Sequence, residues 1–596
     1  VADARDALAV IAVDYDELPA VTDLAAALSG ERLVHEEIRI SDNDAAYFGL
    51  RPQRGTNVCH RFRIRQGETA AALAEADVVV EDVFTTSAAQ QAPMEPHATL
   101  AAWSDGKLSV WTGSHTPFNV RSDLARIFSL PEDRVRVVCP PMGGSFGAKT
   151  FVHTEAIAAA LARKAGRPVR LVLSSPEAWV TNGRHPSRIR IRLGATAEGL
   201  ITAKEVDSVV DTGAYADCGP GVAVKIGYSA VGPYSIANVS VESRCVYTNL
   251  PPNGAFRGYG ATQAAWASEQ LIDRLADRLR LDPLELRLRN VLRDGDRFCT
   301  GEIVQDVNFA ECLERAAAAV RWGDGRAGKG LAVVLKGMQT PSRAEIAVEE
   351  SDGGYVLRCA TAELGQGAKQ ALALHASELL GVPPDEIAFP DPDTDVVPYD
   401  TRATSSRSTY MMTKALERAV EDLRTRGGRG HGEFRNQGGL DPDTGQGVAS
   451  SHWHQGAAAV EVDVDEETGV VDVTRMHAVV YAGSVVNPPG AALQNEGGMI
   501  MGVGGALFEE VSYADGQVTN ANLSDYEIAS IADLGHVTHE SLERPGAEIH
   551  GLGETAVPPI PAAVGNALTS LGLEVNDLPI SAERVLEAVD RRDGPS

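Results

Sequence analysis

The chain has 596 residues, which is too many for a single hydrophobic core, so we expect several domains. Hydrophobic residues make up 44% of the sequence, which excludes a disordered polymer. The formal net charge of −28 at pH 7 argues against a surface that binds nucleic acid or an anionic membrane. It does not exclude an anionic ligand, because a local pocket can oppose the field of the whole protein.

Seven scattered cysteines, with no C-x-x-C pair among them, favour a reducing compartment such as the cytoplasm. They also provide no framework for an iron–sulfur cluster on this chain. No apolar run reaches the roughly 18 residues that span a membrane, and the glycine-rich stretch 497–508 predicts a buried segment instead. Because the chain starts at Val1 and soon enters a strand pattern at 11–15, we expect an N-terminus that is processed, trimmed or located on another chain.

Strand-like and helix-like patterns alternate along the chain, which predicts a mixed α/β (α+β) fold. We expect three units, at residues 1–83, 84–325 and 326–596, with a Gly/Arg-rich linker at 321–329. The polar, glycine-rich stretch 424–447 is expected to be a loop or a mobile lid. The clearest predicted elements are, in chain order, a helix over 70–76, strands over 78–83, 98–103 and 135–139, and helices over 155–165, 264–280, 369–380 and 410–424.

A carboxylate on a glycine-rich turn marks the C-terminal region, in the sequence Gly551-Leu552-Gly553-Glu554 followed by Thr555-Ala556-Val557-Pro558-Pro559. Glycines permit a left-handed backbone and a close approach to neighbouring groups, and prolines fix the exit of the turn. A carboxylate held in this way suits a general base, which must stay within hydrogen-bond reach of the proton that it accepts. The alternative on these residues alone is an ordinary solvated acidic turn.

The loop Met142-Gly143-Gly144-Ser145-Phe146-Gly147-Ala148-Lys149-Thr150 lies between a predicted strand and a predicted helix. This arrangement aims backbone N–H groups at an anion and resembles a P-loop. A P-loop has glycine directly before its lysine, whereas this chain has Ala148, so binding of ATP is the minor alternative. Phe146 is unusual on a polar loop and is expected to line a buried space.

Four further turns combine small residues with polar groups that could hold an anion. Arg257 lies in the turn 253–263 and could make paired hydrogen bonds to an oxo or phosphate group. Gln366 lies directly before a predicted helix, and Gln494 precedes a glycine-rich apolar stretch. The hydroxyl-rich run 403–409 opens another helix, either as a plain N-cap or as a cradle for a polyanion.

Taken together and in this order, these turns resemble those of the molybdopterin-binding large subunit of the molybdenum hydroxylases, the xanthine dehydrogenase and aldehyde oxidoreductase family. The matching stretches run from Met94-Glu95-Pro96-His97 to Gly551-Leu552-Gly553-Glu554-Thr555 and cover nearly the whole chain. Each motif alone is weak evidence for this family, but the complete set in this order is specific to it. The nearest likeness is to bacterial three-subunit members, whose large subunit carries neither flavin nor clusters.

The resemblance implies a fold, a cofactor and partners. The fold would be an incomplete, hammerhead-like N-terminal domain followed by two large mixed α/β molybdopterin-binding domains. The cofactor would be molybdenum held by the dithiolene of molybdopterin, in bacteria usually the cytosine dinucleotide form, with no direct protein ligand to the metal. A small iron–sulfur subunit and a medium FAD subunit would complete a heterotrimer, which is expected to dimerise.

The resemblance also implies an activity and assigns roles to residues. The activity is hydroxylation of an electron-poor carbon in an N-heteroaromatic compound or an aldehyde, with water as the oxygen source and electrons leaving through the partner subunits. Glu554 matches the family's general base, and Lys225 and Thr150 match positions that face the substrate. The positions that match contacts of the cofactor or of its oxo group are His115, Gly144, Phe146, Gly147, Arg257, Gln366, Ser405, Ser406, Arg407, Ser408, Gln494 and Gly553.

Departures from the family pattern narrow the expected chemistry. His115 stands where the family often has glutamine, and it would add a titration near neutrality. Purine-oxidising members carry glutamate and arginine where this chain has Thr150 and Lys225, so a purine substrate is not expected. Carbon monoxide dehydrogenases carry a cysteine in place of Gly258, so that chemistry is not expected either. The segment 424–441 is shorter than in most relatives and would leave a more open channel for the substrate.

Two alternatives stay open at this point. The first is a P-loop-like nucleotide-binding protein that uses residues 143–150, against which Ala148 argues. The second is a non-catalytic assembly subunit of the same family, against which the retained Glu554 argues.

Overall fold

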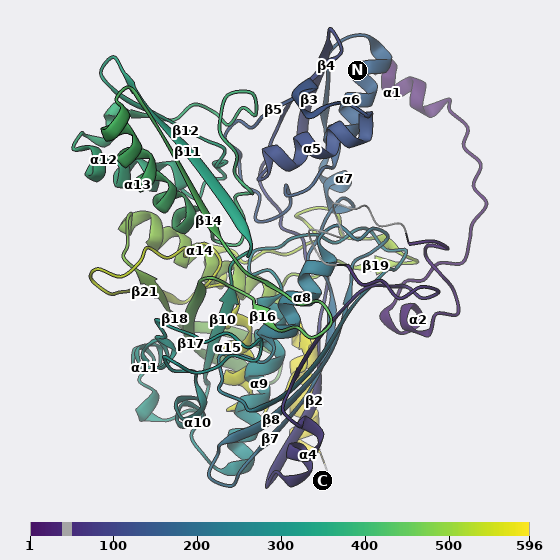
Figure 1. Ribbon diagram of the computed structural model, residues 1–596. Helices are drawn as coiled ribbons and strands as arrows, with labels where there is room; N and C mark the ends of the chain where they lie inside the picture. Colours follow the sequence, from purple (N-terminus) through teal and green to yellow (C-terminus); the bar gives the residue numbers. More distant parts are fainter. Residues whose placement is uncertain (1, 39–49, 595–596) are drawn as a thin grey trace.

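The computed structural model describes residues 2–38 and 50–594 of the chain. Figure 1 shows a large body of sheets and helices that carries two smaller lobes at its upper end. The first lobe, in blue, is built from residues near 98–172, and the second lobe, in green, from residues near 342–436. Helices and strands are mixed in each part, which confirms the mixed α/β fold class.

The first lobe consists of one four-stranded sheet and two helices, namely β3 (Ala98–Ser104), β4 (Lys107–Thr112), α5 (Pro117–Phe128), β5 (Val135–Val138), α6 (Thr154–Ala165) and β6 (Val169–Val172). The strands lie in the order β5-β4-β3-β6. In β4, Leu108 and Val110 are buried and alternate with less buried neighbours, as in a strand with one covered face. Ala158 and Ala162 of α6 are fully packed in the same core, where their small side chains allow the helix to lie close to the sheet.

The second lobe consists of β11 (Ser342–Ser351), β12 (Gly354–Cys359), α12 (Ala368–Leu380), β13 (Ile387–Ala388), α13 (Ser408–Arg426) and β14 (Arg429–Asn436), with the strand order β13-β12-β11-β14. The expectation of a loop or lid over 424–447 is therefore wrong for β14. A Cβ at Gly430 or Gly432 would lie 2.0 or 1.9 Å from a backbone oxygen of α13. These glycines serve close packing of the strand against the helix and not a flexible loop.

The body contains two sheets whose strands come from distant parts of the chain. The first sheet is, in spatial order, β1 (Val58–Gln66), β9 (Asn238–Val246), β8 (Ile201–Asp211), β7 (Ser187–Ala195), β2 (Val78–Thr86) and β22 (Asp577–Leu578). The second sheet is β10 (Lys329–Gly337), β17 (Trp453–Asp465), β18 (Val470–Gly483) and β21 (His536–Glu543). The boundary between the first two units, which the sequence predicts at residue 83, falls inside β2. The division into three units stays a prediction.

Helices fill the space around the two sheets of the body. α9 (Ala261–Leu279) contacts β2 and β7 of the first sheet and β10 of the second sheet, and it also packs against α15 (Pro559–Thr569). The stretch 497–508 lies largely within α14 (Pro488–Leu507), where Met499 and Val503 are fully buried, so the prediction of a buried segment is confirmed. The other helices of the body are α4 (Thr69–Glu75), α8 (Gly219–Ser229), α10 (Pro283–Asn290), α11 (Phe309–Ala319) and α16 (Ala582–Asp593).

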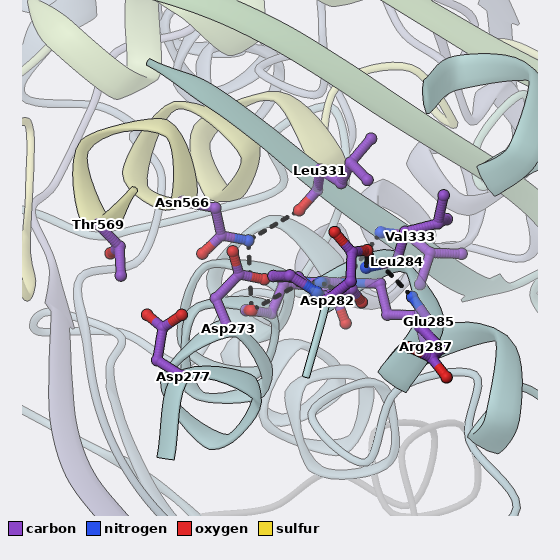
Figure 2. A network of polar contacts seen from close by, with 12 residues as sticks. Asp273, Asp277, Asp282, Leu284, Glu285, Arg287, Leu331, Val333, Asn566 and Thr569 are labelled. Carbon is purple, nitrogen blue, oxygen red and sulfur yellow. Dashed lines mark hydrogen bonds and ion pairs between the residues drawn. The ribbon is translucent and has the colours of Figure 1, made fainter. Parts of the chain in front are cut away.

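A buried polar network joins α9 and α10 to β10 and α15 (Figure 2). Arg287 of α10 donates to Glu269 at 3.0 Å and to Asp273 at 2.6 Å, and its side chain is fully buried. The carboxylate of Glu269 also accepts the N–H of Val333 in β10 at 3.0 Å, and its backbone oxygen accepts from Asn566 in α15 at 3.3 Å. The network therefore fixes the packing of the second sheet on α9 and α10.

The strand expected at 11–15 is wrong. Residues in this segment, which lies between α1 (Ala2–Ala9) and α2 (Leu24–Ser29), have no regular structure. Ile11, Val13 and Tyr15 are 62%, 58% and 83% exposed, because no strand among the described residues pairs with them. None of the helices within residues 2–38 and 50–594 combines the length and the apolar character that a bilayer crossing requires.

Candidate active site

A cavity of about 820 Å³ lies where loops of the two lobes meet loops of the body. Its wall is drawn from most of the chain, from His60 of β1 to Glu554. Of the site residues proposed from the sequence, Gly144 and Arg407 do not line it. Those that do line it are His115, Phe146, Gly147, Thr150, Lys225, Arg257, Gln366, Ser405, Ser406, Ser408, Gln494, Gly553 and Glu554.

The wall of the cavity is cationic, although the chain as a whole is strongly anionic. Lys225, Arg257 and Arg402 line it. Among the described residues of the wall, Glu554 is the one carboxylate. The local charge of the cavity is thus opposite to the charge of the whole protein, as a site for an anion requires.

Three helices begin at the cavity. Ala368 is the first residue of α12, Ser408 is the first residue of α13, and Gly490 lies in the first turn of α14, and all three line the wall. Backbone N–H groups in a first turn lack partners within the helix and carry partial positive charge. The first turn of α14 offers no free N–H group, because Pro488 and Pro489 have none and the N–H of Gly490 donates to Oδ1 of Asn487 at 3.1 Å. In α12, the N–H of Lys369 already donates to Oε2 of Glu363 at 3.2 Å. The remaining first-turn N–H groups of α12 and α13, together with the cationic side chains, suit an anionic ligand.

Glu554 is held by a backbone N–H group and by a lysine. The N–H of Gly258 donates to Oε2 of Glu554 at 3.2 Å, and Nζ of Lys336 lies 3.2 Å from the same oxygen. The Glu554 side chain is 14% exposed, so its carboxylate reaches the cavity while it is largely shielded from solvent. A Cβ at Gly551 would lie 1.8 Å from the backbone oxygen of Ser406, so the turn before Glu554 needs glycine to pack against the second lobe.

Arg257 ties the turn of Glu554 to α14. Its Nε donates to the backbone oxygen of Gly553, and its Nη2 donates to the backbone oxygen and the side-chain Oε1 of Gln494, at 2.9 Å each. Burial lowers the pKa of Arg257 to about 10, so the side chain remains a cation at neutral pH. These paired hydrogen bonds, which the sequence suggested for an oxo or phosphate group, are made to the protein itself.

The loop before α6 has a strained backbone at Phe146. The φ angles are 53° at Phe146 and 117° at Gly147, a region that bulky residues rarely adopt. A Cβ at Gly147 would lie 2.3 Å from the backbone oxygen of Ala255, and the N–H of Arg257 donates to the oxygen of Phe146 at 2.8 Å. Gly144 lies beside the Phe146 ring, where a Cβ would come within 3.4 Å of it. The loop thereby presents Phe146, which is 39% exposed, at the cavity wall.

His115 is buried and neutral. Its Nδ1 donates to the carbonyl oxygen of Ala403 at 2.9 Å, so Nε2 of the neutral ring accepts a hydrogen bond from the hydroxyl of Ser145. Burial lowers the pKa of His115 to about 4, and the expected titration near neutrality is therefore wrong. Because both ring nitrogens are engaged, neutral His115 has no N–H group left to donate into the cavity.

The turn before α13 presents two serines with left-handed backbone. The φ angles are 59° at Ser405 and 53° at Ser406. The Oγ of Ser406 is buried and has no hydrogen-bond partner among the residues that the structure describes. Arg407 is fully buried and pairs with Asp400 at 2.7 Å, so it supports the turn and does not reach the cavity. An unpaired buried hydroxyl beside a helix N-terminus is expected where a ligand supplies the missing partner.

Two polar side chains of the wall stabilise their own turns. Oε1 of Gln366 accepts the N–H of Leu364 at 2.6 Å. The hydroxyl of Thr150 donates to the backbone oxygen of Gly147 at 2.7 Å. Both side chains still line the cavity, and the oxygen of Thr150 can also accept a hydrogen bond from a ligand.

Lys225 is the wall cation whose charge changes near neutral pH. Its Nζ donates to the backbone oxygens of Gly337 at 3.0 Å and Met338 at 3.4 Å, which leaves one N–H of the ammonium group for a ligand. Burial, together with the neighbouring charge of Lys336, lowers the pKa of Lys225 to about 7.

Two models of a molybdopterin cofactor-binding domain match the chain, one over residues 50–291 and the other over residues 302–429 and 426–535. The chain is 30% identical to a probable xanthine dehydrogenase subunit of Bacillus subtilis (strain 168), over 98% of this chain and 86% of that protein. The chain belongs to the xanthine dehydrogenase and aldehyde oxidoreductase family of molybdenum hydroxylases. Within this family it is a molybdenum-binding large subunit, as the order of its turns predicted.

Two solved structures of similar oxidoreductases have the same fold as this chain. The aldehyde oxidoreductase from Desulfovibrio gigas is similar with a TM-score of 0.89 and 28% identity, over 99% of this chain and 68% of that chain. The quinoline 2-oxidoreductase from Pseudomonas putida 86 is similar with a TM-score of 0.84 and 26% identity, over 99% of this chain and 84% of that chain. The prediction of a molybdenum-dependent oxidoreductase is confirmed.

The cavity of this molybdenum hydroxylase suits a phosphorylated pterin. The unpaired hydroxyl of Ser406, the N-terminal ends of α12 and α13, and the cations Lys225 and Arg402 all face the same space. Such groups are the usual partners of phosphate and of polar heterocycles. Within the described part of the chain, no group of three or more His, Cys, Asp or Glu side chains is arranged to hold a metal ion.

The geometry argues against the P-loop interpretation of residues 143–150. The Lys149 side chain is 1% exposed, and its Nζ pairs with Glu95 at 2.8 Å. A P-loop lysine must be free to reach the phosphates of a nucleotide. In addition, α6 begins only at Thr154, so the loop does not run directly into the helix.

Parts of the wall of this molybdenum hydroxylase were not expected from the sequence. A hairpin of β15 (Gly439–Leu440) and β16 (Gly447–Val448) lines the cavity beside β1, and a Cβ at its Gly445 would lie 2.1 Å from the backbone oxygen of Arg63. Lys336, which pairs with Glu554 but does not itself line the wall, was also missed. The sequence does mark this residue, because a lysine directly after the apolar run 331–335 places a charge at the end of a strand that is expected to be buried. A channel that is more open than in relatives stays a prediction.

Proposed function

We propose that this large subunit hydroxylates an electron-poor carbon of an N-heteroaromatic compound or an aldehyde, with water as the source of oxygen. The observation that carries the proposal is the position of Glu554, a single carboxylate among the described residues of a cationic cavity. A general base must lie within reach of the proton that it accepts, and the hydrogen bond from Gly258 keeps the Glu554 carboxylate at the wall. In the proposal, Glu554 accepts the proton that is released when water becomes the attacking nucleophile.

The proposed ligand of the cavity is molybdenum-molybdopterin in its cytosine dinucleotide form. When bound, this cofactor supplies the metal centre that takes up the two electrons removed from the substrate. A volume of about 820 Å³ lies in the upper part of the range of small-molecule sites, which supports a large ligand. We propose that the chain holds it through Phe146, Gly147, Arg257, Gln366, Ser405, Ser406, Ser408, Gln494 and Gly553, while His115, Gly144 and Arg407 support these turns.

Lys225 and Thr150 are proposed to face the substrate. Lys225 can donate to a carbonyl oxygen or a ring nitrogen through the one N–H group that its two backbone contacts leave over. The Thr150 oxygen can accept a hydrogen bond from the same substrate. These two residues lie in the wall that Glu554 also lines, so a substrate can contact them while its reacting carbon is near the base.

The proposed partners are a small iron–sulfur subunit and a medium FAD subunit, assembled as a dimer of heterotrimers in the cytoplasm. Support comes from the seven cysteines of the chain, which are buried free thiols and are spread over separate elements. Electrons taken from the substrate would therefore pass to redox groups on the partner chains.

The first test is purification of the large subunit together with its co-purifying partners. We expect stoichiometric molybdenum, release of a cytidine nucleotide on acid hydrolysis, and dye reduction with a member of a panel of heterocycles and aldehydes. A complex that contains no molybdenum, or that binds ATP in its place, would refute the proposal.

The second test is Glu554→Gln, with Glu548→Gln as the matched control. Glu548 lies on the same segment and has a side chain that is 58% exposed and pairs with Lys414. We expect Glu554→Gln to lower kcat by about 10²–10⁴-fold at unchanged molybdenum content, because a general base contributes a factor of this size. Turnover that persists in Glu554→Gln would disprove the assignment of the base. A wild-type complex with full molybdenum and no turnover would favour the alternative of an assembly subunit.

A further inference from the structure

Lys336 is a buried lysine near the end of β10. Its side chain is 2% exposed, and the residues before it in the strand, 331–335, are buried as well. The next residue, Gly337, has no room for a side chain, since a Cβ there would lie 2.4 Å from the hydroxyl of Tyr228. Burial of an ammonium group is costly unless an opposite charge lies beside it. The position of Lys336 therefore requires an anionic partner.

The anionic partner of Lys336 is Glu554. Among the described residues, the ion pair with Oε2 of Glu554, at 3.2 Å, is the one that Lys336 makes, and its Nζ has no hydrogen-bond partner there. The pairing of β10 with β17 fixes its place, with Lys336 opposite His454. His454 is not a competing charge, because burial and the charge of Lys336 hold its pKa well below the usual range.

The other charged and titratable groups that face Glu554 are occupied elsewhere or are neutral. Arg257, from the turn before α9, donates to backbone oxygens and to a glutamine side chain. Lys225 of α8 donates to backbone oxygens at the end of β10. His115, after β4, is neutral because burial lowers its pKa, and the phenol of Tyr228 in α8 is neutral because burial raises its pKa.

We propose that Lys336 is a positioning residue that keeps the Glu554 carboxylate ionised and directed into the cavity. The inference rests on the proposed function, in which Glu554 accepts a proton. A carboxyl group that is shielded from water favours its neutral form, and a neutral acid cannot accept a proton. An ammonium group 3.2 Å away favours the ionised form and restricts rotation of the carboxylate.

The test compares the wild-type holoenzyme with Lys336→Met, Lys336→Arg and the control Lys329→Met. Lys329 lies at the other end of β10, 3.9 Å from Glu461. We expect the acid limb of the kcat/KM profile to move to higher pH by about 1–3 units in Lys336→Met, since an opposite charge at this distance has an effect of that size. The limb should stay in place in Lys336→Arg and in Lys329→Met. Lys336→Gln takes the place of Lys336→Met if the latter does not assemble.

An infrared titration of the same holoenzymes gives a readout that needs no turnover. The band of protonated Glu554 is identified as the carboxyl band that the spectrum of Glu554→Gln lacks. As the pH is lowered, this band should appear at a higher pH in Lys336→Met than in the wild type. This band separates Glu554 from Lys225, whose pKa near 7 also depends on the charge of Lys336.

Two outcomes would overturn the role of Lys336. One is an acid limb and a carboxyl band that stay at their wild-type pH in Lys336→Met. The other is a kcat/KM that falls by the same factor at every pH, as a merely structural residue would cause. A wild-type complex without turnover would refute the proposed function instead, and the infrared titration would still decide on Lys336.

Discussion

A single methyl group at Gly147 should separate two turns of the cavity wall. The Gly147 backbone has a φ of 117°, and a non-glycine residue in such a region costs about 1–3 kcal/mol. A Cβ would lie 2.3 Å from the backbone oxygen of Ala255, whereas ordinary contact begins at 3.4 Å. The Gly147 turn and the turn of Ala255 must therefore move apart by about 1 Å, the difference between these two distances.

This movement breaks the hydrogen bond from the N–H of Arg257 to the oxygen of Phe146, which is 2.8 Å long. Such a bond contributes about 0.5–1.5 kcal/mol. With the backbone strain included, we expect Gly147→Ala to lower the free energy of unfolding by about 2–4 kcal/mol. Arg257 would move with its turn, so the molybdenum content should fall as well.

The assays are urea unfolding and metal analysis of Gly147→Ala beside Gly353→Ala. Gly353 lies between β11 and β12, with a φ of 93° and no heavy atom within 4 Å of the added Cβ. The control therefore carries backbone strain of about 1–3 kcal/mol without the collision, and it should retain molybdenum. Equal stability of the two variants, with wild-type molybdenum in Gly147→Ala, would refute the fixed contact between the two turns.

Three further predictions concern burial and charge. Arg287→Met should lower the free energy of unfolding by about 3–5 kcal/mol, because it leaves the buried carboxylates of Glu269 and Asp273 in the polar network (Figure 2) without their cation. Arg289→Met, which breaks an exposed ion pair on the same helix, should cost less than about 1 kcal/mol. Equal losses of the two variants in urea unfolding would contradict this prediction. His115→Gln should leave the shape of the kcat/KM profile unchanged between about pH 5 and 8, because His115, with a pKa of about 4, is already neutral there; loss of an inflection in the variant would contradict this. For an anionic substrate, KM should rise as pH increases through about 7, because Lys225 loses its proton and its charge, and this rise should be absent from Lys225→Arg.

The helices were predictable because their signals are local. The helix expected over 155–165 is found at 154–165, and the one expected over 410–424 is found at 408–426, each with apolar residues at helical spacing. The strand at 11–15 failed because alternation of apolar residues does not reveal whether a neighbouring strand exists. The strand at 429–436 was missed because Gly430 and Gly432 have the composition of a loop, and their reason is a helix that packs on them only in the folded chain.

The turns of the site could be selected from the sequence, but their contacts could not. Glycine frames marked the turns of Glu554 and Phe146, since only a few residues tolerate the backbone that such turns require. Nothing local shows that the guanidinium of Arg257 binds the protein itself, or that His115 is buried and neutral. Lys336 escaped notice because its partner is far away in the sequence and is brought to it by the packing of a strand against a loop.

The first sheet of the body pairs β1 with β9 and β2 with β22, so it needs residues from both the early and the late parts of the chain. The lobes differ, because each builds its sheet from a continuous stretch and can fold while the chain is still on the ribosome. The cavity lies between these parts and is not enclosed until the segment that carries Glu554 has been translated. A ligand of this cavity can therefore be fully enclosed only after the late segment has been translated.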